Sequence, residues 1–285
     1  MTTGTQTSLT EKINILRDKT GAGVMACKNA LVANGYDIEK AVEELRKKGL
    51  ADVAKRAARS TKEGLVTLKI SGDARTYVLS ELTCETDFVA KTPDFKKLSE
   101  DIANYVLANG KDGDFAEDAQ IKEMITAVAP KMGENMGFRR AVCYKASANS
   151  AIYYYLHSDN KKASLVELQS DGPAPADKLQ AAAKELAMQV VAMSPRYLNQ
   201  TQVPAEEVAK EKEIYTTQAK NQGKPDAAIA KMLDGRIRKF YEEICLLNQT
   251  SVRDSKKSVE QYLAEITAGL GKVTVKRFVR YQLGA

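Results

Sequence analysis

The sequence predicts an α+β protein in which small antiparallel sheets and helical segments follow one another in blocks. Residues 65–82 and 151–168 align without gaps at an offset of 86 residues, and each reads as strand, Asp-containing turn and strand. Residues 8–49 and 204–244 instead carry apolar side chains at helical spacing. With 285 residues, 44% of them hydrophobic, the chain is long enough for one large domain or for about two to three ordinary ones.

Residues 8–49 are predicted to form a three-helix, UBA-like module. Leu9, Ile13 and Leu16 lie four and three residues apart and give the first helix one apolar face. Glycines then break the chain, and an Asn-Gly pair ends the second helix. Asp37 is the expected N-cap of the third helix, which we expect to close at Gly49. The basic segment 50–62 reads as a linker that is helical at least in part.

The two aligned hairpins define two duplicated core subdomains, each a small antiparallel sheet backed by helices. A helix with Thr92 as N-cap and Pro93 at its first position follows the first hairpin. Leu179, Leu186 and Val190 mark the corresponding helix after the second hairpin. Each subdomain also gains a late strand with a basic start, at residues 138–142 and 275–279.

An antiparallel helical hairpin is predicted as an insertion in the second subdomain. Pro204 opens a charged helical run, a Gly-Lys-Pro turn follows, and a second run returns. Apolar residues recur along the second run at Ile229, Leu233, Ile237, Phe240 and Ile244. The predicted division is therefore 1–55 for the N-terminal module and linker, 56–148 for the first core subdomain, 149–203 with 246–285 for the second, and 204–245 for the hairpin arm. Such an arm could serve self-association.

The composition argues against an enzyme and against bound cofactors or metals. The only histidine, His157, lies in a predicted strand and leaves no histidine pair for a metal. No G-x-x-x-x-G-K-[ST] loop occurs. Four cysteines stand far apart, which is typical of reduced thiols in a cytoplasm: Cys27, Cys84, Cys143 and Cys245. No apolar run has membrane-spanning length, and the polar first eight residues carry no visible targeting signal, so we expect a cytoplasmic protein.

Two short motifs each have a structural and a functional interpretation. The run from Gly21 to Ala26 matches a dinucleotide fingerprint, but that motif must follow a strand, whereas the preceding residues have a helical period. The glycines are better explained as a sharp turn between helices. The segment 83–90 connects a strand to a helix and places Phe88 beside an acid. Phe88 or Val89 could pack onto the next helix as a hydrophobic staple, or Phe88 could be an exposed wedge for a partner.

Three segments resemble the elongation factor Ts family. They are LRDKTGAGVMACK at residues 16–28, ETDFVA at 85–90 and KMGEN at 131–135. With the duplicated core and the helical hairpin, the resemblance spans essentially the whole chain. It implies a non-enzymatic partner of the GTPase elongation factor Tu that speeds release of GDP so that GTP can bind. It implies no cofactor of its own and no direct contact with membrane or nucleic acid.

The resemblance also implies roles for particular residues. Thr86, Asp87, Phe88 and Val89 match the segment that enters near the Mg²⁺ and phosphate site of the partner. Arg17, Val24 and Met25 match residues that dock on its nucleotide domain, although methionine is usual where this chain has Val24. His157 matches a histidine that lies towards the partner, but a lone half-buried histidine also fits a structural role.

Two other functions remain open from the residues alone. The basic linker and late strands, with the tyrosines at 153–155, could bind RNA or the ribosome. Strand alternation would place at least one of those rings inside, however. A three-helix module also occurs in ubiquitin-binding adaptors, but an adaptor function would not account for the duplicated core.

Overall fold

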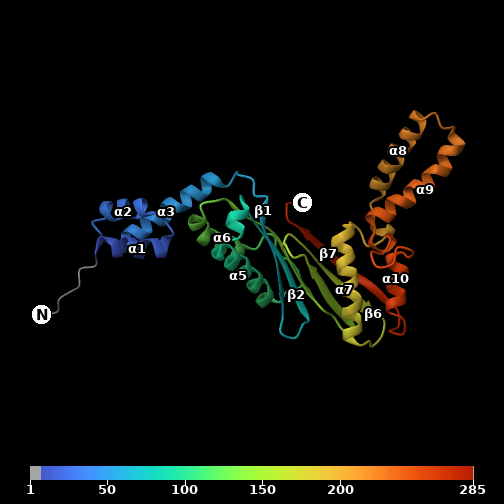
Figure 1. Ribbon diagram of the computed structural model, residues 1–285, viewed down its shortest axis with the longest axis horizontal. Coiled ribbons are helices and arrows are strands. Elements are labelled where there is room, and N and C mark those ends of the chain that lie inside the picture. Colours follow the sequence, from blue (N-terminus) through green and yellow to red (C-terminus); the bar gives the residue numbers. More distant parts are fainter. Residues whose placement is uncertain (1–7, 285) are drawn as a thin grey trace. The chain divides into compact units, whose positions relative to one another are not determined.

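The computed structural model describes residues 8–284, apart from the side chains at positions 50, 54, 226 and 227. The first residues, for which the sequence predicts no targeting signal, lie outside this range. The protein has the predicted α+β architecture, with a helical segment first and two small sheets after it (Figure 1). The chain groups into two compact units: Met1–Lys69, Val78–Cys143 and Gln282–Ala285 in one, Ile70–Tyr77 and Tyr144–Tyr281 in the other.

The N-terminal module consists of α1 (Leu9–Thr20), α2 (Val24–Ala33) and α3 (Ile38–Arg56). A capping box opens α1, because Ser8 Oγ accepts from the Glu11 amide and the Glu11 carboxylate accepts from the Ser8 amide. Asp37 caps α3 as predicted, with its carboxylate 3.1 Å from the Lys40 amide nitrogen. The three helices share a small core. Its buried members are Leu16, Cys27, Ala30, Leu31, Ala41 and Leu45.

The predicted end of the third helix at Gly49 is wrong, because α3 continues through the basic segment to Arg56. A Cβ at Gly49 would lie 2.8 Å from the Cβ of Pro130 in α6 (Ala119–Met132). The glycine therefore lets two helices approach closely within the helix interior, and the usual reading of glycine as a helix end fails here.

The first sheet has the order β1 (Glu63–Ile70), β2 (Thr76–Cys84), β4 (Met136–Lys145), β3 (Gly113–Asp114). Helix α5 (Pro93–Asn109) begins at the predicted Thr92 cap, whose hydroxyl accepts from the Phe95 amide. Side chains of α5, α6, β2 and β4 share one core that contains fully buried Phe95, Ile102 and Ile121. Helix α6 was not predicted, although Asp118 caps its start by accepting from the Ile121 amide.

The second sheet has the order β5 (Ser150–Leu156), β6 (Lys162–Ser170), β7 (Val273–Gln282). Strands β5 and β6 are antiparallel, with Ile152 opposite Glu167. Helix α7 (Ala176–Met193) buries the predicted Leu179, Leu186 and Val190, and α10 (Val259–Ile266) packs into the same subdomain. Helix α10 was also not predicted. Two short 3-10 turns, Gln200–Gln202 and Leu246–Asn248, complete this region.

The duplicated hairpins turn in the same way. Asp73 and its aligned counterpart Asp159 each accept a hydrogen bond from the amide two residues later, at 3.0 and 2.8 Å. The residue after each Asp, Ala74 or Asn160, adopts a left-handed backbone with φ of 52° or 54°. An Asx turn that tolerates positive φ thus recurs at the same place in both repeats.

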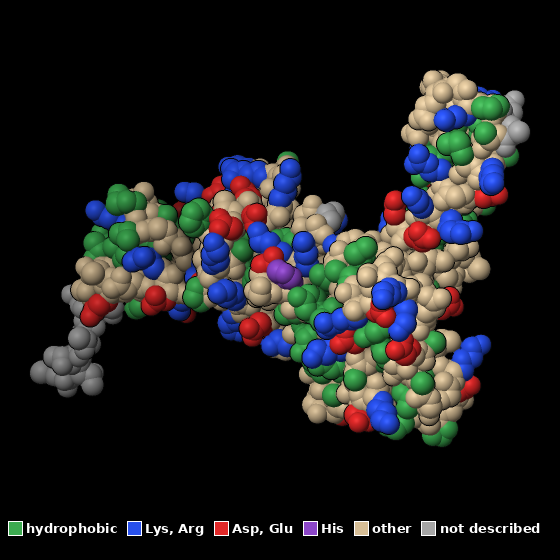
Figure 2. Space-filling view, turned by 45° about the vertical axis from the view of Figure 1, so that its right-hand side comes forward, with side chains coloured by type: hydrophobic (Ala, Val, Ile, Leu, Met, Phe, Trp, Pro, Cys, Tyr) green, Lys and Arg blue, Asp and Glu red, His purple; other side chains and the backbone are tan. Residues whose placement is uncertain are grey.

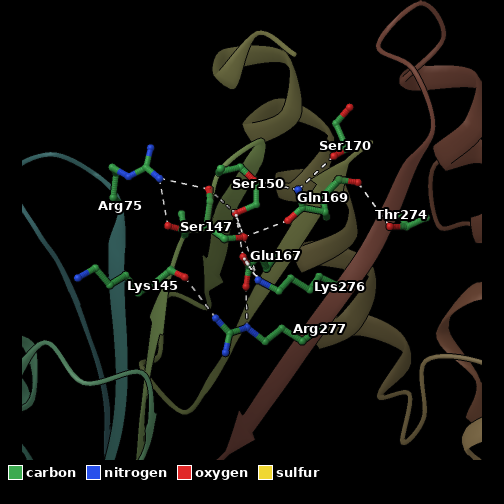
Figure 3. A network of polar contacts seen from close by, with 12 residues as sticks. Arg75, Lys145, Ser147, Ser150, Glu167, Gln169, Ser170, Thr274, Lys276 and Arg277 are labelled. Atoms are coloured by element: carbon green, nitrogen blue, oxygen red, sulfur yellow. Dashed lines mark hydrogen bonds and ion pairs between the residues drawn. The ribbon is translucent and has the colours of Figure 1, made fainter. Parts of the chain in front are cut away.

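Each repeat also buries one glutamate beneath two successive basic residues of its late strand. Glu81 on β2 is fully buried and pairs with Arg139 and Arg140 on β4. Its counterpart Glu167 on β6 is equally buried, with Lys276 Nζ at 3.0 Å and Arg277 Nε at 2.6 Å. Figure 3 shows both cations reaching from β7 towards Glu167. The basic starts of the late strands are therefore the partners of these buried acids.

The arm is a pair of helices, α8 (Ala205–Asn221) and α9 (Asp226–Ile244), that projects as a hairpin in Figure 1. The predicted Gly-Lys-Pro segment forms the turn between them. Most of the predicted stripe is buried along α9, with Leu233 half-buried. At the base, the Tyr197 amide donates to the Ile244 carbonyl at 3.0 Å, so the two ends of the arm meet within the same subdomain.

Candidate functional site

The predicted partner-binding segment forms a one-turn helix, α4 (Asp87–Ala90), between β2 and α5. Thr86 is its N-cap, and the threonine hydroxyl accepts from the Val89 amide at 3.4 Å. The Lys91 amide returns to the Asp87 carbonyl at 3.2 Å. The sequence predicted a connection here, but not that its residues would be helical.

The two apolar residues of α4 point to different environments. Phe88 is 79% exposed, the most exposed of the large hydrophobic side chains in the described residues. Val89 instead packs against the core of the first sheet, next to buried Ala90. Val89 therefore packs inward as a staple would, whereas the Phe88 ring faces solvent. Beside the ring, the Asp87 carboxylate lies 2.5 Å from Lys91 Nζ, and both groups are open to solvent.

Residues just before β4 hold this segment in place. The Glu134 carboxylate accepts from the amides of Glu85 at 3.1 Å and Thr86 at 3.0 Å, and from the Thr86 hydroxyl at 2.6 Å. In return, the Glu85 carboxylate accepts from the Asn135 amide at 2.6 Å. From the sequence, residues 131–135 carry only a family resemblance, without a predicted role. No spacing rule connects positions that lie 48 residues apart.

The thiol next to the segment is unsuited to chemistry. Burial, with the Glu134 and Glu63 carboxylates nearby, raises the pKa of Cys84 to about 12. Its sulfur lies 3.1 Å from the Thr86 carbonyl. All four cysteines are buried, and none of them forms a disulfide. Within residues 8–284, no group of three or more His, Cys, Asp or Glu side chains is arranged to hold a metal.

The predicted docking residues Arg17, Val24 and Met25 flank the turn between α1 and α2. Val24 is 48% and Met25 64% exposed at the start of α2, where a folded module would normally bury such side chains. Arg17 is exposed in the last turn of α1, and its carbonyl accepts from the Gly21 amide at 2.7 Å. The turn joins two helices, so the Gly-x-Gly run has the helix-connecting role that we predicted.

His157 lies just after β5, not inside a strand as predicted. Its Nδ1 is 3.2 Å from the Asp159 carboxylate, and its side chain is 43% exposed. A hydrogen bond from the Lys161 amide, and then the contact with His157, holds the pKa of Asp159 below its usual value. In the first hairpin the aligned Ser71 makes the same contact with Asp73. The turn-stabilising contact therefore belongs to the repeat, whereas the imidazole ring is particular to the second hairpin.

The described helices include none that is both long and apolar enough to cross a bilayer.

Comparison with known proteins places these features in one family. The family model described as Elongation factor TS matches residues 85–285. The Elongation factor Ts of Prosthecochloris aestuarii is 41% identical over 281 residues, which cover 95% of this chain and 96% of that protein. The protein of the same name from Clostridium botulinum strain Alaska E43 is 41% identical over 285 residues, covering 96% and 92%. That of Symbiobacterium thermophilum is 40% identical over 272 residues, covering 94% and 90%.

Proposed function

This chain belongs to the elongation factor Ts family of translation elongation factors, and we propose that it acts as a guanine-nucleotide exchange factor for elongation factor Tu. It binds the GDP-loaded GTPase in the cytoplasm and promotes loss of GDP, so that GTP can take its place. It performs no bond-making chemistry, and it needs no catalytic residue or cofactor.

The observation that carries this proposal is the outward position of Phe88 on α4. An aromatic ring that is 79% exposed on a helix fixed by side-chain hydrogen bonds is costly to leave in water and is a typical anchor at protein interfaces. Asp87 stands next to it and can compete for cations or donors in the partner. We propose that Thr86–Val89 enters near the Mg²⁺ and phosphate site of elongation factor Tu, with Val89 anchoring the helix from the inside.

Docking is the proposed role of Arg17, Val24 and Met25. Their exposure at the turn of the N-terminal module offers an apolar contact next to a cation. Val24 has a short, stiff side chain, so we expect Met25 to supply more of the contact area. His157 is proposed as a further docking residue, since a hollow of about 400 Å³ adjoins it.

The energetics require several contacts together. An exchange factor that weakens GDP binding must itself bind less tightly when GDP is present, because coupling between two ligands is reciprocal. To shift the partner from mostly loaded to mostly empty takes roughly 5 kcal/mol of differential affinity. One exposed side chain does not supply that amount, whereas a wedge with docking contacts elsewhere can.

The direct test is release of labelled GDP from purified elongation factor Tu, with and without this protein and with unlabelled GDP in excess. We expect release to accelerate with the protein concentration and to saturate. Met25→Ala should raise the half-saturating concentration more than it lowers the maximal rate. A release rate that is the same with and without the protein would rule the proposal out.

An RNA- or ribosome-binding function is the second candidate. Figure 2 shows Lys and Arg side chains interspersed with Asp and Glu over the face in view. The chain carries 43 basic against 37 acidic residues, and the basic starts of both late strands are paired with buried glutamates. These pairings weaken the electrostatic case for RNA. Tight, steeply salt-dependent binding to RNA would favour this second function.

A further inference from the structure

We propose that Glu134 is a positioning residue for nucleotide exchange: its carboxylate holds α4 so that Phe88 stands outward, an inference that rests on the exchange function proposed above. Glu134 itself makes no contact with a nucleotide in this scheme. It acts through Thr86, the residue that caps the helix carrying Phe88.

A four-residue helix has too few internal hydrogen bonds to order itself. Its start is fixed from outside, because Glu134 Oε2 accepts from the amides of Glu85 and Thr86 while Oε1 accepts from the Thr86 hydroxyl at 2.6 Å. With its proton directed to Glu134, the Thr86 hydroxyl presents a lone pair to the Val89 amide. One ionised carboxylate thus orders three consecutive residues, and bonds to an ionised acceptor are the stronger kind.

Comparing the two repeats distinguishes contacts common to both subdomains from contacts found only at α4. In the first repeat the Glu85 carboxylate accepts from the amide of Asn135, the residue before β4. In the second repeat the aligned Asp171 accepts from the amide of Lys272, the residue before β7, at 3.0 Å. This contact closes the same junction in both subdomains, so we assign it to the fold.

The Glu134 contact has no counterpart in the second repeat. The residue before Lys272 is Gly271, which adopts a left-handed backbone with φ of 77° and has no side chain to offer a carboxylate at this place. The second connection, residues 171–175, also enters α7 without a preceding helical turn. The first repeat therefore has two additional features that occur together, the helix α4 and the carboxylate that caps it through Thr86.

The experiment compares the full-length protein with Glu134→Ala, Glu134→Gln and Glu134→Asp in the GDP-release assay over a range of concentrations. For Glu134→Ala we expect the maximal rate to fall about tenfold or more, as when a positioned group is released, with little change in the half-saturating concentration. Glu134→Gln should lose less, about threefold, because its amide oxygen still accepts from both backbone amides although its NH2 group cannot accept from the Thr86 hydroxyl. Glu134→Asp keeps the charge but is one methylene shorter, so we expect a loss between these two.

Amide hydrogen exchange followed by NMR provides a readout that does not depend on the partner. Glu134→Ala should speed exchange at Val89 and Lys91, whose amides bond within α4, and leave the interior of α5 protected. Asp171→Ala is the matched control. It removes the shared contact of the second repeat and should lower the melting temperature, while the maximal release rate stays within about twofold of the parent.

The possible failures are distinguishable. If the parent protein does not accelerate GDP release, the exchange function is overturned, and the amide measurements still decide whether Glu134 orders α4. If the parent is active and Glu134→Ala matches its maximal rate, the positioning role is overturned. An equal loss in Glu134→Gln and Glu134→Ala would also overturn it, because the acceptor that Glu134→Gln keeps for the Glu85 and Thr86 amides would then make no difference. If Glu134→Ala does not fold, the maximal rates and amide exchange of Glu134→Asp and Glu134→Gln are compared with those of the parent instead.

Discussion

At the scale of single residues, neighbours in the sequence have opposite tasks on α4. Phe88 and Val89 are both apolar, yet one ring is exposed and the other side chain packs on the core. A one-turn helix directs consecutive side chains about 100° apart, so the choice between them depends on where the helix is anchored. The anchor is the Thr86 cap.

We predict that Phe88→Ala folds with an unchanged melting temperature but loses most exchange activity. The ring makes little contact within the protein, whereas truncating an interface anchor costs about 2 kcal/mol or more of binding. Thermal melts and GDP-release rates measure the two effects. Val89→Ala is the matched control and should lower the melting temperature, because Val89 packs against the core. A large drop in the melting temperature of Phe88→Ala would instead place the ring in the core.

A second residue-scale prediction concerns acid stability through Glu167. Burial alone would raise the pKa of this carboxyl, but hydrogen bonds from Ser150, Lys276 and Arg277 outweigh burial and hold it below its ordinary value. The folded state therefore favours the ionised form. The resulting stabilisation is complete above the ordinary glutamate pKa of about 4.3 and disappears as the pH falls through the lower, folded-state value.

Glu167→Gln should accordingly lower the free energy of unfolding by about 3 kcal/mol near neutral pH. This value is at the low end of the range for breaking a buried ion pair, because Lys276 and Arg277 both remain partly exposed. Thermal or urea melts from neutral pH to about pH 3 should show the difference between parent and variant shrinking with acid. A difference that stays constant over this range would contradict the assignment.

At the scale of elements, the close approach of α3 and α6 shows how packing can override a local signal. Glycine in a helix interior lowers helix stability by about 1 kcal/mol relative to alanine. For this reason the sequence predicts a helix end at Gly49. In the structure Gly49 lies inside α3, and Pro130 occupies the space where a side chain would lie.

We predict opposite effects for the same substitution at two helical glycines. Gly49→Ala should lower stability by about 1 kcal/mol or more, because overpacking against Pro130 exceeds the gain in helix propensity. Gly235→Ala in α9, where nothing lies within 4 Å of the added Cβ, should raise the local helix stability by up to about 1 kcal/mol. Urea-induced unfolding of both variants tests this pair. A stabilised Gly49→Ala would show that the two helices separate at little cost.

At the scale of the whole molecule, the chain combines a duplicated core with two additions, the N-terminal module and the arm. The arm makes its own contacts at its base, where Val208 and Tyr241 pack with Phe240 and Ile244. Glu207 there accepts from the Tyr197 hydroxyl at 2.7 Å. Farther out, Ile214 remains 39% exposed on α8. We propose that the outer arm serves self-association or a second partner.

Deletion of residues 210–238, closed by a short Gly/Ser linker, should leave the maximal exchange rate within about twofold of the parent. The retained base keeps its packing, and closing a short flexible loop costs little entropy. Sedimentation should show whether any self-association is lost, and circular dichroism checks that the remainder is folded. A folded deletion variant that binds elongation factor Tu without releasing GDP would place part of the mechanism in the arm.

Features that depend on residues close together in the chain could be predicted from the sequence. Apolar spacing identified the helices of the N-terminal module and the arm, and Asp37 and Thr92 marked helix starts through hydrogen bonds that reach only three residues. The duplication predicted two similar hairpins with late strands. Helices α6 and α10 were not predicted, although local signals mark their starts. These signals are Asp118 for α6 and the Ser258 capping box for α10.

Contacts between residues far apart in the chain depend on folding, and no local pattern predicted them. In the folded protein Pro130 packs against Gly49 in the interior of α3, and Glu134 binds Thr86. Folding also exposes Phe88 while burying part of Val89. Local spacing sets the period of an element, whereas the direction of one side chain at a short helix depends on anchors that folding brings from elsewhere in the sequence.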